Sequence, residues 1–398
     1  MWQIYKRIYI FAPYKRIKTT IKLRIGVNSR LLLKDKLEGI GYFTLKNLER
    51  ITRNHPDDEF ILFFDRPYDK EFVFAKNVKP VVIPLPTRHP VLWHIYFNIL
   101  IPIYLKLYKI DVFFSTEGYI PTWGKTPKVC TIHDINFEHD DSFIGNKIYL
   151  KYMKYFSPRF AKRAKIVLTV SEYSKQDLIK TYGVEESKIF VVESSANEDF
   201  KEYSEEMKIL TRQKYTNHSP YFYFVGALHK RKNLTNLFKA FDAFKLKTQS
   251  DVKLLIVGNK KWWKGEIEDT YNAMQFKDEV VFTGRLPLEE VNKIAAASIG
   301  LVFVSFFEGF GLPPLEAYRA KTAVITSNTS SMPEVAGEGA LYANPYDVES
   351  ICKAMTDLYE QPSLREDLIR KGENQAKKYS WDKTAELVWN AIEQVMKK

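Results

Sequence analysis

The sequence predicts an α/β protein with two doubly wound, parallel-sheet domains that face each other across a cleft. Apolar, β-branched runs of strand length alternate with helix-length segments along almost the whole chain, which is typical of parallel sheets covered by helices. We count thirteen such runs, and one sheet rarely holds so many strands. The chain has 398 residues, 45% of them hydrophobic, so it is long and apolar enough to build two cores.

The predicted strands are the runs richest in Val, Ile, Phe and Tyr. In the first half of the chain they cover residues 23–28, 60–64, 81–84, 112–115, 129–133, 166–170 and 189–192. In the second half they cover residues 221–225, 253–257, 280–283, 301–304, 323–326 and 340–342. Helical patterns lie between several of them, for example over residues 41–54 and 173–182.

The domain boundary is expected within residues 200–220, a polar, charged segment without apolar periodicity. This divides the chain into a basic N-terminal extension (1–22), an N-terminal domain (23–200) and a C-terminal domain (201–379). The tail, residues 380–398, is predicted to be one helix. Ser380 is a suitable N-cap, and apolar residues follow it at helical spacing, namely Trp381, Ala385, Val388, Trp389 and Ile392.

Basic residues are in excess, and they are unevenly distributed. The formal net charge is +12, from 60 basic and 48 acidic residues. Residues 1–30 hold eight basic residues and no acid, and residues 146–165 hold seven and again no acid. Such segments suit anionic partners: nucleic acid, an anionic membrane surface or a phosphorylated substrate.

Several features point to the cytoplasm. Cys130 and Cys352 show neither metal-ligand nor redox spacing, which fits buried thiols in a reducing compartment. The first residues show no secretory signal. The longest uncharged run, residues 89–105, is interrupted by Pro90 and Pro102, so we expect a helix buried between strands and no integral membrane segment.

The most informative stretch is VSFFEGFGLPPLE, residues 304–316. Glu308 and Glu316 bracket a Gly-Phe-Gly-Leu-Pro-Pro loop that follows a predicted strand and opens a helix. Glycine N–H groups at a helix N-terminus favour an anion such as a phosphate. A capping carboxylate beside a tight turn would be the structural alternative for either glutamate alone.

Other polar clusters also follow predicted strands, where ligands collect in α/β proteins. After residues 221–225, Gly226 allows a turn, and Arg231 and Lys232 stand before a helical segment. A guanidinium and an ammonium there suit a diphosphate, although a solvated basic turn would look alike.

A glycine pair and a histidine form two more clusters of this kind. Gly39 and Gly41 precede a helical segment, but Thr44 stands where a dinucleotide fingerprint needs its third glycine. His133, followed by Asp134, ends the strand predicted over residues 129–133. Ordinary turn chemistry would explain this pair, and no partner spacing supports His133 as a metal ligand.

These motifs, in this order from about Arg24 to the C-terminus, resemble the retaining glycosyltransferases of family 4. The resemblance implies the GT-B fold, in which two Rossmann-like domains face each other. Members of this family carry two glutamates, separated by seven residues, that bind a nucleotide-sugar donor. The resemblance therefore implies that Glu308 lies by the donor sugar and that Glu316 holds the ribose hydroxyls.

The resemblance assigns further roles residue by residue. It places Arg231 and Lys232 on the donor diphosphate and His133 on the donor sugar, so these three and Glu308 are the implied catalytic residues. It also implies that the terminal helix packs back on the N-terminal domain. The remaining donor contacts that it implies fall on Gly39, Gly41, Gly226, Arg285, Leu286, Gly309, Phe310, Gly311, Leu312 and Glu316.

Two segments depart from the family pattern. Ala196 stands where the family often has a small polar residue. The hinge geometry or the contact with the acceptor is therefore expected to differ there. Lys321 and Ala323 replace a common glycine and proline, and we expect a differently shaped turn there. Residues 331–345 resemble the family's closing segment and are expected to be mainly structural.

The sequence therefore predicts a retaining glycosyltransferase that moves a hexose from a nucleotide diphosphate sugar to a saccharide or polyprenyl diphosphate-linked acceptor. GDP-mannose is the leading donor, because the spelling of the 308–317 loop is that of mannosyltransferase-like members. No Asp-x-Asp occurs in the sequence, so we expect no metal and no cofactor. The family's usual proposal is a front-face displacement within an ion pair.

The basic segments 1–22 and 146–165 are expected to dock the enzyme on the inner face of the cell membrane, for surface polysaccharide synthesis. Two alternatives remain: a soluble glycogen- or sucrose-type glucosyltransferase, and a non-catalytic nucleotide- or nucleic-acid-binding protein. No aromatic-rich RNA-binding strand is present in the sequence, so nucleic acid is not an expected partner.

Overall fold

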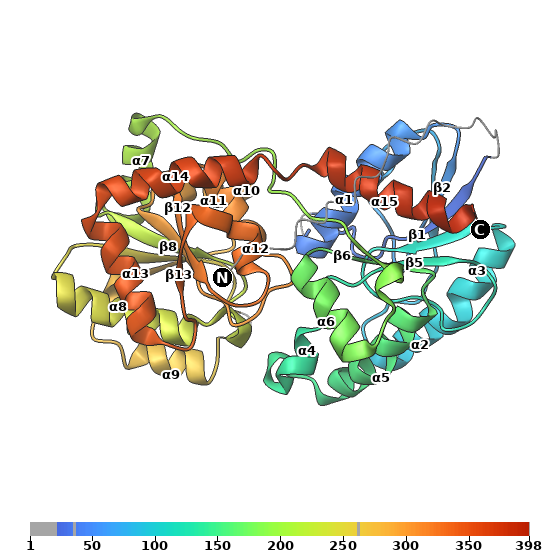
Figure 1. Cartoon of the computed structure of the whole chain (residues 1–398), viewed down its shortest axis with the longest axis horizontal. Helices are drawn as coiled ribbons and strands as arrows, with labels where there is room; N and C mark the ends of the chain where they lie inside the picture. Colours follow the sequence, from blue (N-terminus) through green and yellow to red (C-terminus); the bar gives the residue numbers. More distant parts are fainter. Residues whose placement is uncertain (1–21, 35–36, 261–262, 398) are drawn as a thin grey trace.

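The computed structural model describes residues 22–34, 37–260 and 263–397, which form two lobes side by side (Figure 1). Each lobe is built on one parallel sheet covered by helices. The sheet of the N-terminal lobe has seven strands in the order β3-β2-β1-β4-β5-β6-β7, and that of the C-terminal lobe has six in the order β10-β9-β8-β11-β12-β13. The predicted fold class is confirmed.

Each of the thirteen predicted runs overlaps a strand. In the N-terminal lobe the strands are β1 (Arg24–Asn28), β2 (Glu59–Phe64), β3 (Val78–Val82), β4 (Val112–Ser115), β5 (Lys128–Thr131), β6 (Ile166–Thr169) and β7 (Ile189–Val191). In the C-terminal lobe they are β8 (Tyr221–Val225), β9 (Lys253–Val257), β10 (Val280–Gly284), β11 (Gly300–Phe303), β12 (Ala323–Ser327) and β13 (Ala340–Ala343). The largest shift is at β3, an edge strand that begins three residues early and tolerates Pro80.

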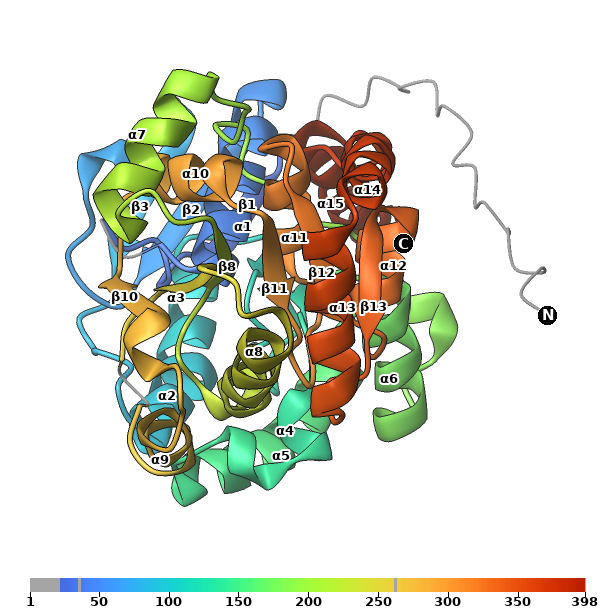
Figure 2. The same cartoon turned by 90° about the vertical axis from the view of Figure 1, so that its left-hand side faces the viewer.

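Helices cover both sheets. Those of the N-terminal half are α1 (Gly39–Asn54), α2 (Pro90–Ile95), α3 (Ile101–Leu107), α4 (Asn136–His139), α5 (Lys147–Arg163) and α6 (Glu172–Tyr182). Those that follow are α7 (Glu205–Thr216), α8 (Leu234–Thr248), α9 (Glu266–Asn272), α10 (Leu288–Ala297), α11 (Leu312–Arg319), α12 (Met332–Ala336), α13 (Val348–Glu360), α14 (Pro362–Ala376) and α15 (Trp381–Met396). Figure 2 looks onto the C-terminal lobe, where α8 and α13 lie side by side.

The segment between residues 200 and 220 is more ordered than its composition predicts. It contains α7, which begins at the N-cap Ser204 and packs against α10. The Arg212 Nε donates to the Ala297 carbonyl at 3.0 Å. The helix therefore belongs to the C-terminal lobe, although few of its side chains are apolar enough to show a periodic pattern.

After α14 the chain crosses to the N-terminal lobe, where the C-terminal helix α15 lies (Figure 1). Its N-cap is Ser380, as predicted, and the Ser380 Oγ accepts from the Lys383 N–H at 3.2 Å. Trp381 is 1% exposed, and its Nε1 donates to the Ala196 carbonyl at 3.0 Å. Trp389 stacks on His55, just after α1, with ring centroids 3.6 Å apart. The apolar stripe of α15 thus packs on the N-terminal lobe.

Residues 89–105 form a helical rod, but the expectation that it is buried is wrong for its outer face, which is exposed. A continuous helical rod runs through α2, a π-helical turn η2 (Tyr96–Leu100) and α3. Between residues 90 and 107 its length and hydropathy would suffice for a membrane span, and 33% of this window is buried. Length and composition alone are weak evidence for a span, but several large apolar side chains on this rod face solvent.

Two other expectations can be placed. Cys130 and Cys352 are buried free thiols. The basic N-terminal extension lies outside the described residues except for Lys22. Arg30, one of the cations counted in residues 1–30, is 9% exposed and ion-paired, so it does not contribute to a basic surface.

Candidate active site

The loop between β11 and α11 is tightly held. Gly311 has a φ of +90°, and a Cβ at this residue would lie 2.2 Å from the Met332 Cε, so a larger residue would strain the backbone and displace the Met332 side chain. The Ser331 hydroxyl donates to the carbonyls of Glu308 and Phe310, which lie 2.9 and 3.0 Å away. The loop therefore presents Glu308 in a fixed position at the carboxyl end of β11.

Glu308 is bound to the two cations that follow the neighbouring strand β8. A 3-10 turn, η5 (Lys230–Lys232), carries them. The Arg231 Nη1 lies 2.8 Å from the Glu308 Oε2, and the Lys232 Nζ lies 2.6 Å from the Oε1. The Arg231 Nη1 also donates to the Phe307 carbonyl at 2.6 Å.

This arrangement shifts the pKa values of Glu308 and Lys232. Burial raises the pKa of Glu308, but Arg231 and Lys232 outweigh it and hold that pKa at about 2. Burial lowers the pKa of Lys232, and Glu308 opposes this effect. The site is therefore a compact cluster of one carboxylate and two cations, with a net positive charge that suits a diphosphate.

The backbone of His133, on the other lobe, lies against the loop that carries Glu308. A Cβ on Gly309 would come within 2.4 Å of the His133 carbonyl oxygen, so the glycine allows the lobes to approach closely. The Ser174 hydroxyl bonds to the carbonyls of His133 and Gly309, both at 3.2 Å. The Ser171 hydroxyl donates to the Gly309 carbonyl at 2.7 Å.

The tautomer of His133 follows from its hydrogen bond. Its Nε2 lies 2.8 Å from the Thr116 carbonyl oxygen, which can only accept, so Nε2 carries the proton. Burial lowers the pKa of His133, against the effect of the Thr116 carbonyl and Asp134. The ring is therefore neutral near pH 7 and keeps a lone pair on Nδ1.

Glu316 lies in the first turns of α11, and its environment contrasts with that of Glu308. Burial raises its pKa to about 7, although a hydrogen bond to the Asn197 backbone opposes this effect. Burial raises the pKa of Tyr42, which lies on α1 of the N-terminal lobe, and the charges of Asp199 and Glu316 raise it further. Glu316 therefore lies near this tyrosine. Glu316 thus lies beside the junction of the two lobes and changes its charge near neutral pH.

The N-terminal glycine pair opens helix α1. A Cβ on Gly41 would lie 2.7 Å from the Leu31 carbonyl oxygen, whereas nothing lies within 4 Å of one on Gly39. Glu38, the N-cap, makes no side-chain capping bond. The first N–H groups of this 16-residue helix therefore receive no hydrogen bond from the N-cap side chain.

The remaining predicted donor contacts are dispersed. Gly226, with a φ of +150°, packs against β9, and its N–H donates to the Val257 carbonyl at 3.0 Å. Arg285 is exposed and Leu286 half-buried, and both follow the edge strand β10, two strands from β8. Phe310 is 7% exposed and packs edge-on against Tyr379. Leu312 is half-buried at the start of α11.

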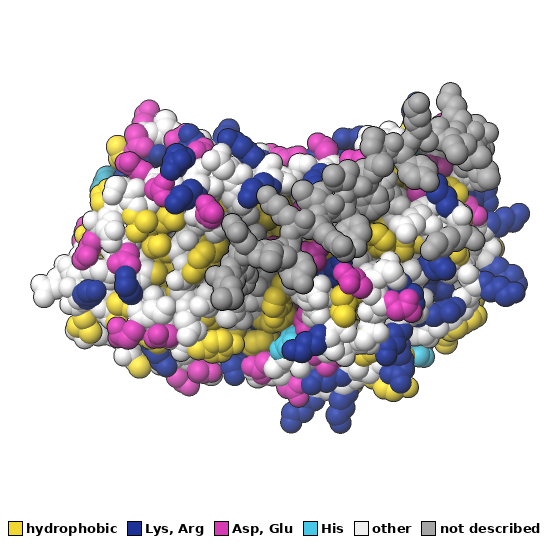
Figure 3. Space-filling view, in the orientation of Figure 1, with side chains coloured by type: hydrophobic (Ala, Val, Ile, Leu, Met, Phe, Trp, Pro, Cys, Tyr) yellow, Lys and Arg dark blue, Asp and Glu magenta, His cyan; other side chains and the backbone are white. Residues whose placement is uncertain are grey.

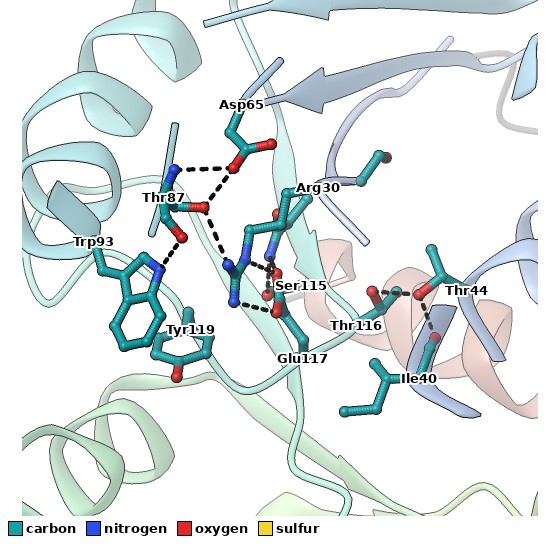
Figure 4. Close-up of polar contacts among 12 residues, drawn as sticks. Arg30, Ile40, Thr44, Asp65, Thr87, Trp93, Ser115, Thr116, Glu117 and Tyr119 are labelled. Carbon is teal, nitrogen blue, oxygen red and sulfur yellow. Dashed lines mark hydrogen bonds and ion pairs between the residues drawn. The ribbon is translucent and has the colours of Figure 1, made fainter. Parts of the chain in front are cut away.

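The sequence interpretation missed a buried polar network at the carboxyl ends of β1 to β4 (Figure 4). The Arg30 guanidinium forms a bidentate pair with Glu117, with Nη2 2.6 Å from Oε2. Its Nη1 donates to the Thr87 Oγ1 at 3.0 Å, and this hydroxyl donates to Asp65 at 2.5 Å. Asp65 and Glu117 closely follow predicted strands. This position at strand ends could have indicated that they are functional candidates.

The network reaches His133 through the chain. Glu117 also accepts from the Asn28 Nδ2 at 2.7 Å. Thr116, next to Glu117, accepts a hydrogen bond from the Thr44 hydroxyl at 2.7 Å, and its carbonyl binds His133. The Arg30–Glu117 pair therefore anchors the segment that sets the tautomer of His133.

A second missed feature joins the lobes. Glu334, in the segment expected to be mainly structural, accepts from the backbone N–H groups of Glu172 and Tyr173 at 2.8 and 3.1 Å. It therefore caps helix α6 from the opposite lobe. Ser171 also caps this helix, by accepting from the Ser174 N–H at 3.1 Å.

The turn around Lys321 also carries information. Lys321 has a φ of +55°, a left-handed conformation that favours glycine. Its Nζ lies 2.9 Å from Glu202 and 3.7 Å from Glu373. Lys321 thus adopts a conformation typical of glycine, and the expectation of a differently shaped turn stays a prediction.

A metal site was not expected, and the described ranges offer no group for one. Within residues 22–34, 37–260 and 263–397, no three or more His, Cys, Asp or Glu side chains gather so that they could hold a metal ion. The ionisable groups predicted for the site are the carboxylates of Glu308 and Glu316, the two cations and the neutral His133.

Two helix-covered parallel sheets, in lobes that meet at the Glu308 loop, form the fold of the GT-B glycosyltransferases. Residues 207–375 match the family described as Glycosyl transferases group 1, and residues 51–199 match Glycosyltransferase Family 4. The chain is 30% identical over 305 residues to the O-antigen chain mannosyltransferase RfbU of Salmonella typhimurium, covering 76% of this chain and 79% of that protein. The chain belongs to glycosyltransferase family 4 and is a glycosyltransferase.

Other relatives agree. The chain is 26% identical over 371 residues to the O-antigen chain mannosyltransferase B of Escherichia coli, covering 90% of this chain and 97% of that one. A crystal structure of Anabaena HepE in complex with UDP and glucose superposes with a TM-score of 0.72 at 13% identity, covering 94% and 100% of the two chains. This last similarity concerns the fold alone.

Proposed function

We propose that the protein is a retaining, metal-independent mannosyltransferase that uses GDP-mannose and a saccharide acceptor in surface polysaccharide synthesis. The observation that carries the proposal is the Glu308–Arg231–Lys232 cluster beside His133, within a chain of family 4. A nucleotide-sugar donor follows from the family. Mannose is favoured because two relatives that cover most of the chain are O-antigen mannosyltransferases.

In the proposed mechanism the two cations stabilise the leaving group. As the bond between the sugar and the diphosphate breaks, negative charge builds on the diphosphate, and Arg231 and Lys232 neutralise it. Both cations bind Glu308 in the structure, so the diphosphate competes with this carboxylate for them. Glu308 then turns toward the donor sugar and orients it.

His133 acts as a neutral group in this scheme. The lone pair on its Nδ1 faces positive charge that develops on the sugar during a front-face displacement, and no enzyme nucleophile is needed. The acceptor hydroxyl attacks from the face that the diphosphate leaves, and its proton passes to the diphosphate oxygen. The configuration at the anomeric carbon is thereby retained.

The other contacts complete the proposed donor site. Glu316 accepts hydrogen bonds from the ribose hydroxyls. Backbone N–H groups in the α11 loop and at the start of α1 face the phosphates and sugar, and the segment after β10 faces the base. These contacts come from Gly39, Gly41, Gly226, Arg285, Leu286, Gly309, Phe310, Gly311 and Leu312.

The test compares transfer from GDP-mannose to a saccharide acceptor in three variants. Glu308→Ala and Arg231→Ala should each lose about 10²–10³ in kcat, as expected when a group that stabilises transition-state charge is removed. Glu360→Ala, an exposed glutamate on α13, is the matched control and should keep full activity. Undiminished transfer in both folded site variants would refute the assignment.

The donor is tested separately. A ligand that binds the native state raises the melting temperature by mass action. GDP-mannose should therefore raise it more than UDP-glucose, UDP-N-acetylglucosamine or a deoxysugar donor. A larger shift with UDP-glucose would favour the glucosyltransferase alternative while leaving the fold and the cation cluster unaffected.

We also propose a lipid-linked acceptor, a polyprenyl diphosphate saccharide at the inner face of the cell membrane. Support comes from α5 and its flanks, which are basic throughout: residues 146–165 contain seven cations and no acid. Lys147 and Lys151 are exposed, while Lys154 is paired with Asp141. A peripheral location on the cytoplasmic side would follow.

A further inference from the structure

A row of large apolar side chains runs along the outer face of the rod formed by α2, η2 and α3. Val91, Ile99, Ile103 and Leu107 are 58%, 48%, 54% and 68% exposed. The last three follow each other at intervals of four residues, which places them on one helical face. Isolated exposed apolar residues are ordinary, but a continuous row marks a surface that something covers.

The opposite face of the same rod is already used. Tyr96, Phe97 and Ile101 are 0% exposed and belong to the core beneath the sheet. Among residues 90–107, Lys106 is the single Lys, Arg, Asp or Glu. The rod is therefore apolar on both faces. Because its inner face is fixed in the lobe, the rod cannot span a membrane, and it would lie flat on a membrane surface.

Aromatic and aliphatic side chains extend the row sideways. Trp123 is 54% exposed, and its Nε1 donates to the Asn98 carbonyl at 2.6 Å, which places it next to the residue that precedes Ile99. Helix α5 packs against α2, with the rings of Trp93 and Tyr149 5.0 Å apart. Two residues of α5, Ile148 and Tyr155, are 61% and 54% exposed. Trp and Tyr prefer the interface between water and lipid.

Cations surround this apolar surface. Figure 3 shows Lys and Arg side chains gathered with yellow patches at the lower right, where Figure 1 places α2, α3 and α5. The exposed basic residues of the rod, the Trp123 loop and α5 are Lys106, Lys125, Lys147, Lys151, Arg159, Lys162 and Arg163. An apolar face rimmed by cations fits an anionic bilayer and fits a neutral or cationic partner poorly.

We propose that the outer face of α2–η2–α3, with Trp123, inserts its apolar side chains into the interface of an anionic membrane while the cations of α5 bind the lipid headgroups. This proposal rests on the proposed lipid-linked acceptor. It names the element that inserts into the membrane, which the basic residues alone could not identify. The insertion holds the N-terminal lobe on the membrane surface, where the lipid-linked acceptor also lies.

The test is co-sedimentation of the full chain with vesicles. Binding is expected to vesicles that contain phosphatidylglycerol, with little to phosphatidylcholine alone, and to weaken as salt rises. The double variant Ile103→Ser/Leu107→Ser should lose at least tenfold in vesicle affinity. Its matched control is Leu246→Ser, a similarly exposed residue of α8 (55%) on the other lobe, which should bind like the parent chain.

A second measurement locates the contact. An environment-sensitive dye attached to Ile103→Cys should shift to the blue on addition of phosphatidylglycerol vesicles, and the same dye on Leu246→Cys should not. The cysteines at 130 and 352 are buried, so labelling is selective. Equal shifts at both sites would overturn the proposed orientation.

Failure of docking and failure of the transferase are distinguishable. The double serine variant should retain transfer to a water-soluble saccharide acceptor, since its two positions lie outside the donor cluster. The surface is refuted if the parent chain binds no vesicle, or if parent and variant bind equally. It is also refuted if the parent self-associates in solution and the variant is monomeric, because a second copy of the chain would then cover the row.

Discussion

Glu308 and Glu316 are close in sequence, but their environments shift their pKa values in opposite directions. Two cations keep the pKa of Glu308 at about 2, so it is ionised near neutral pH. Burial raises the pKa of Glu316 to about 7, and no cation is among the groups that set it. A single loop and the helix that follows it thus carry one constant anion and one group that titrates near neutrality.

Glu316 should therefore make stability depend on pH. Its folded pKa exceeds the unfolded value of about 4.3, so between these values the native state holds a proton that the unfolded chain releases. The stabilising contribution of this proton is fully present below about pH 4.3 and is lost as pH rises to about 7. Glu316→Gln, which cannot ionise, should raise the melting temperature relative to the parent more at pH 8 than at pH 5.

Calorimetry at the two pH values is the measurement, with Glu360→Gln as the exposed control. An equal difference in melting temperature at both pH values would contradict a raised pKa for Glu316. Donor affinity should show the same titration, because a carboxylate accepts ribose hydroxyls better than a carboxylic acid does.

The Arg30–Glu117 pair is the other residue-scale feature, and its removal should be costly. Both residues are 9% exposed, and removing one partner of a buried pair costs about 3–5 kcal/mol. Arg30→Met should lower the free energy of unfolding by this amount in urea titrations. Arg370→Met, which breaks an exposed pair with Asp367 on α14, should change it by less than about 1 kcal/mol. Similar losses in the two variants would contradict a structural role for the buried pair.

At the scale of elements, the junction between lobes depends on helix ends. Helix α6 has one cap from its own chain segment, Ser171, and one from the other lobe, Glu334. A cap within a lobe stabilises one helix, whereas the Glu334 cap also holds the lobes together. At the same junction the Ser171 and Ser174 hydroxyls bind the Gly309 carbonyl.

Glu334→Ala should therefore act differently from an ordinary cap deletion. Losing a cap costs about 0.5–2 kcal/mol, and here the loss should also separate the lobes, increase the radius of gyration and lower kcat at least tenfold. Ser204→Ala removes the cap of α7, which lies within one lobe, and should leave kcat and the radius unchanged. Small-angle scattering and transfer assays distinguish the two, and equal behaviour would contradict a role for Glu334 at the junction.

At the scale of the whole molecule, α15 links the two lobes into one structure. The chain leaves the C-terminal lobe after α14, and α15 packs on α1 and on the sheet of the N-terminal lobe. Trp381 lies at the crossing, edge-on to Tyr42 with ring centroids 5.7 Å apart. The packing of the N-terminal lobe thus depends on residues at the far end of the sequence.

Trp381→Ala should reveal this dependence. Removing a buried Trp typically costs about 3–5 kcal/mol, and the loss should fall on the N-terminal lobe, so that urea unfolding separates into two transitions. Leu246→Ala, on the exposed face of α8, should keep a single transition near the parent midpoint. One unshifted transition in Trp381→Ala would show that the lobe does not need this contact.

The sequence alone determined the local features of this protein. The thirteen strands, helix α15 and the strand-to-helix loop of Glu308 could all be predicted, because hydrophobic periodicity and turn chemistry depend on near neighbours. The family motifs also brought Arg231, Lys232, Glu308 and His133 into one predicted site. Segments with few apolar residues, such as α7, lack this signal, so their sequence resembles a linker.

Only the tertiary structure decided how distant residues meet and which faces remain uncovered. Arg30 and Glu117 lie 87 positions apart, and Glu172 and Glu334 lie 162 apart, so no local pattern reports either contact. The rod over residues 90–107 is apolar on both faces, and a one-dimensional pattern cannot tell which side the sheet covers. The order of the strands and the packing of the lobes set these pairings and exposures, because burial is a property of the assembled fold.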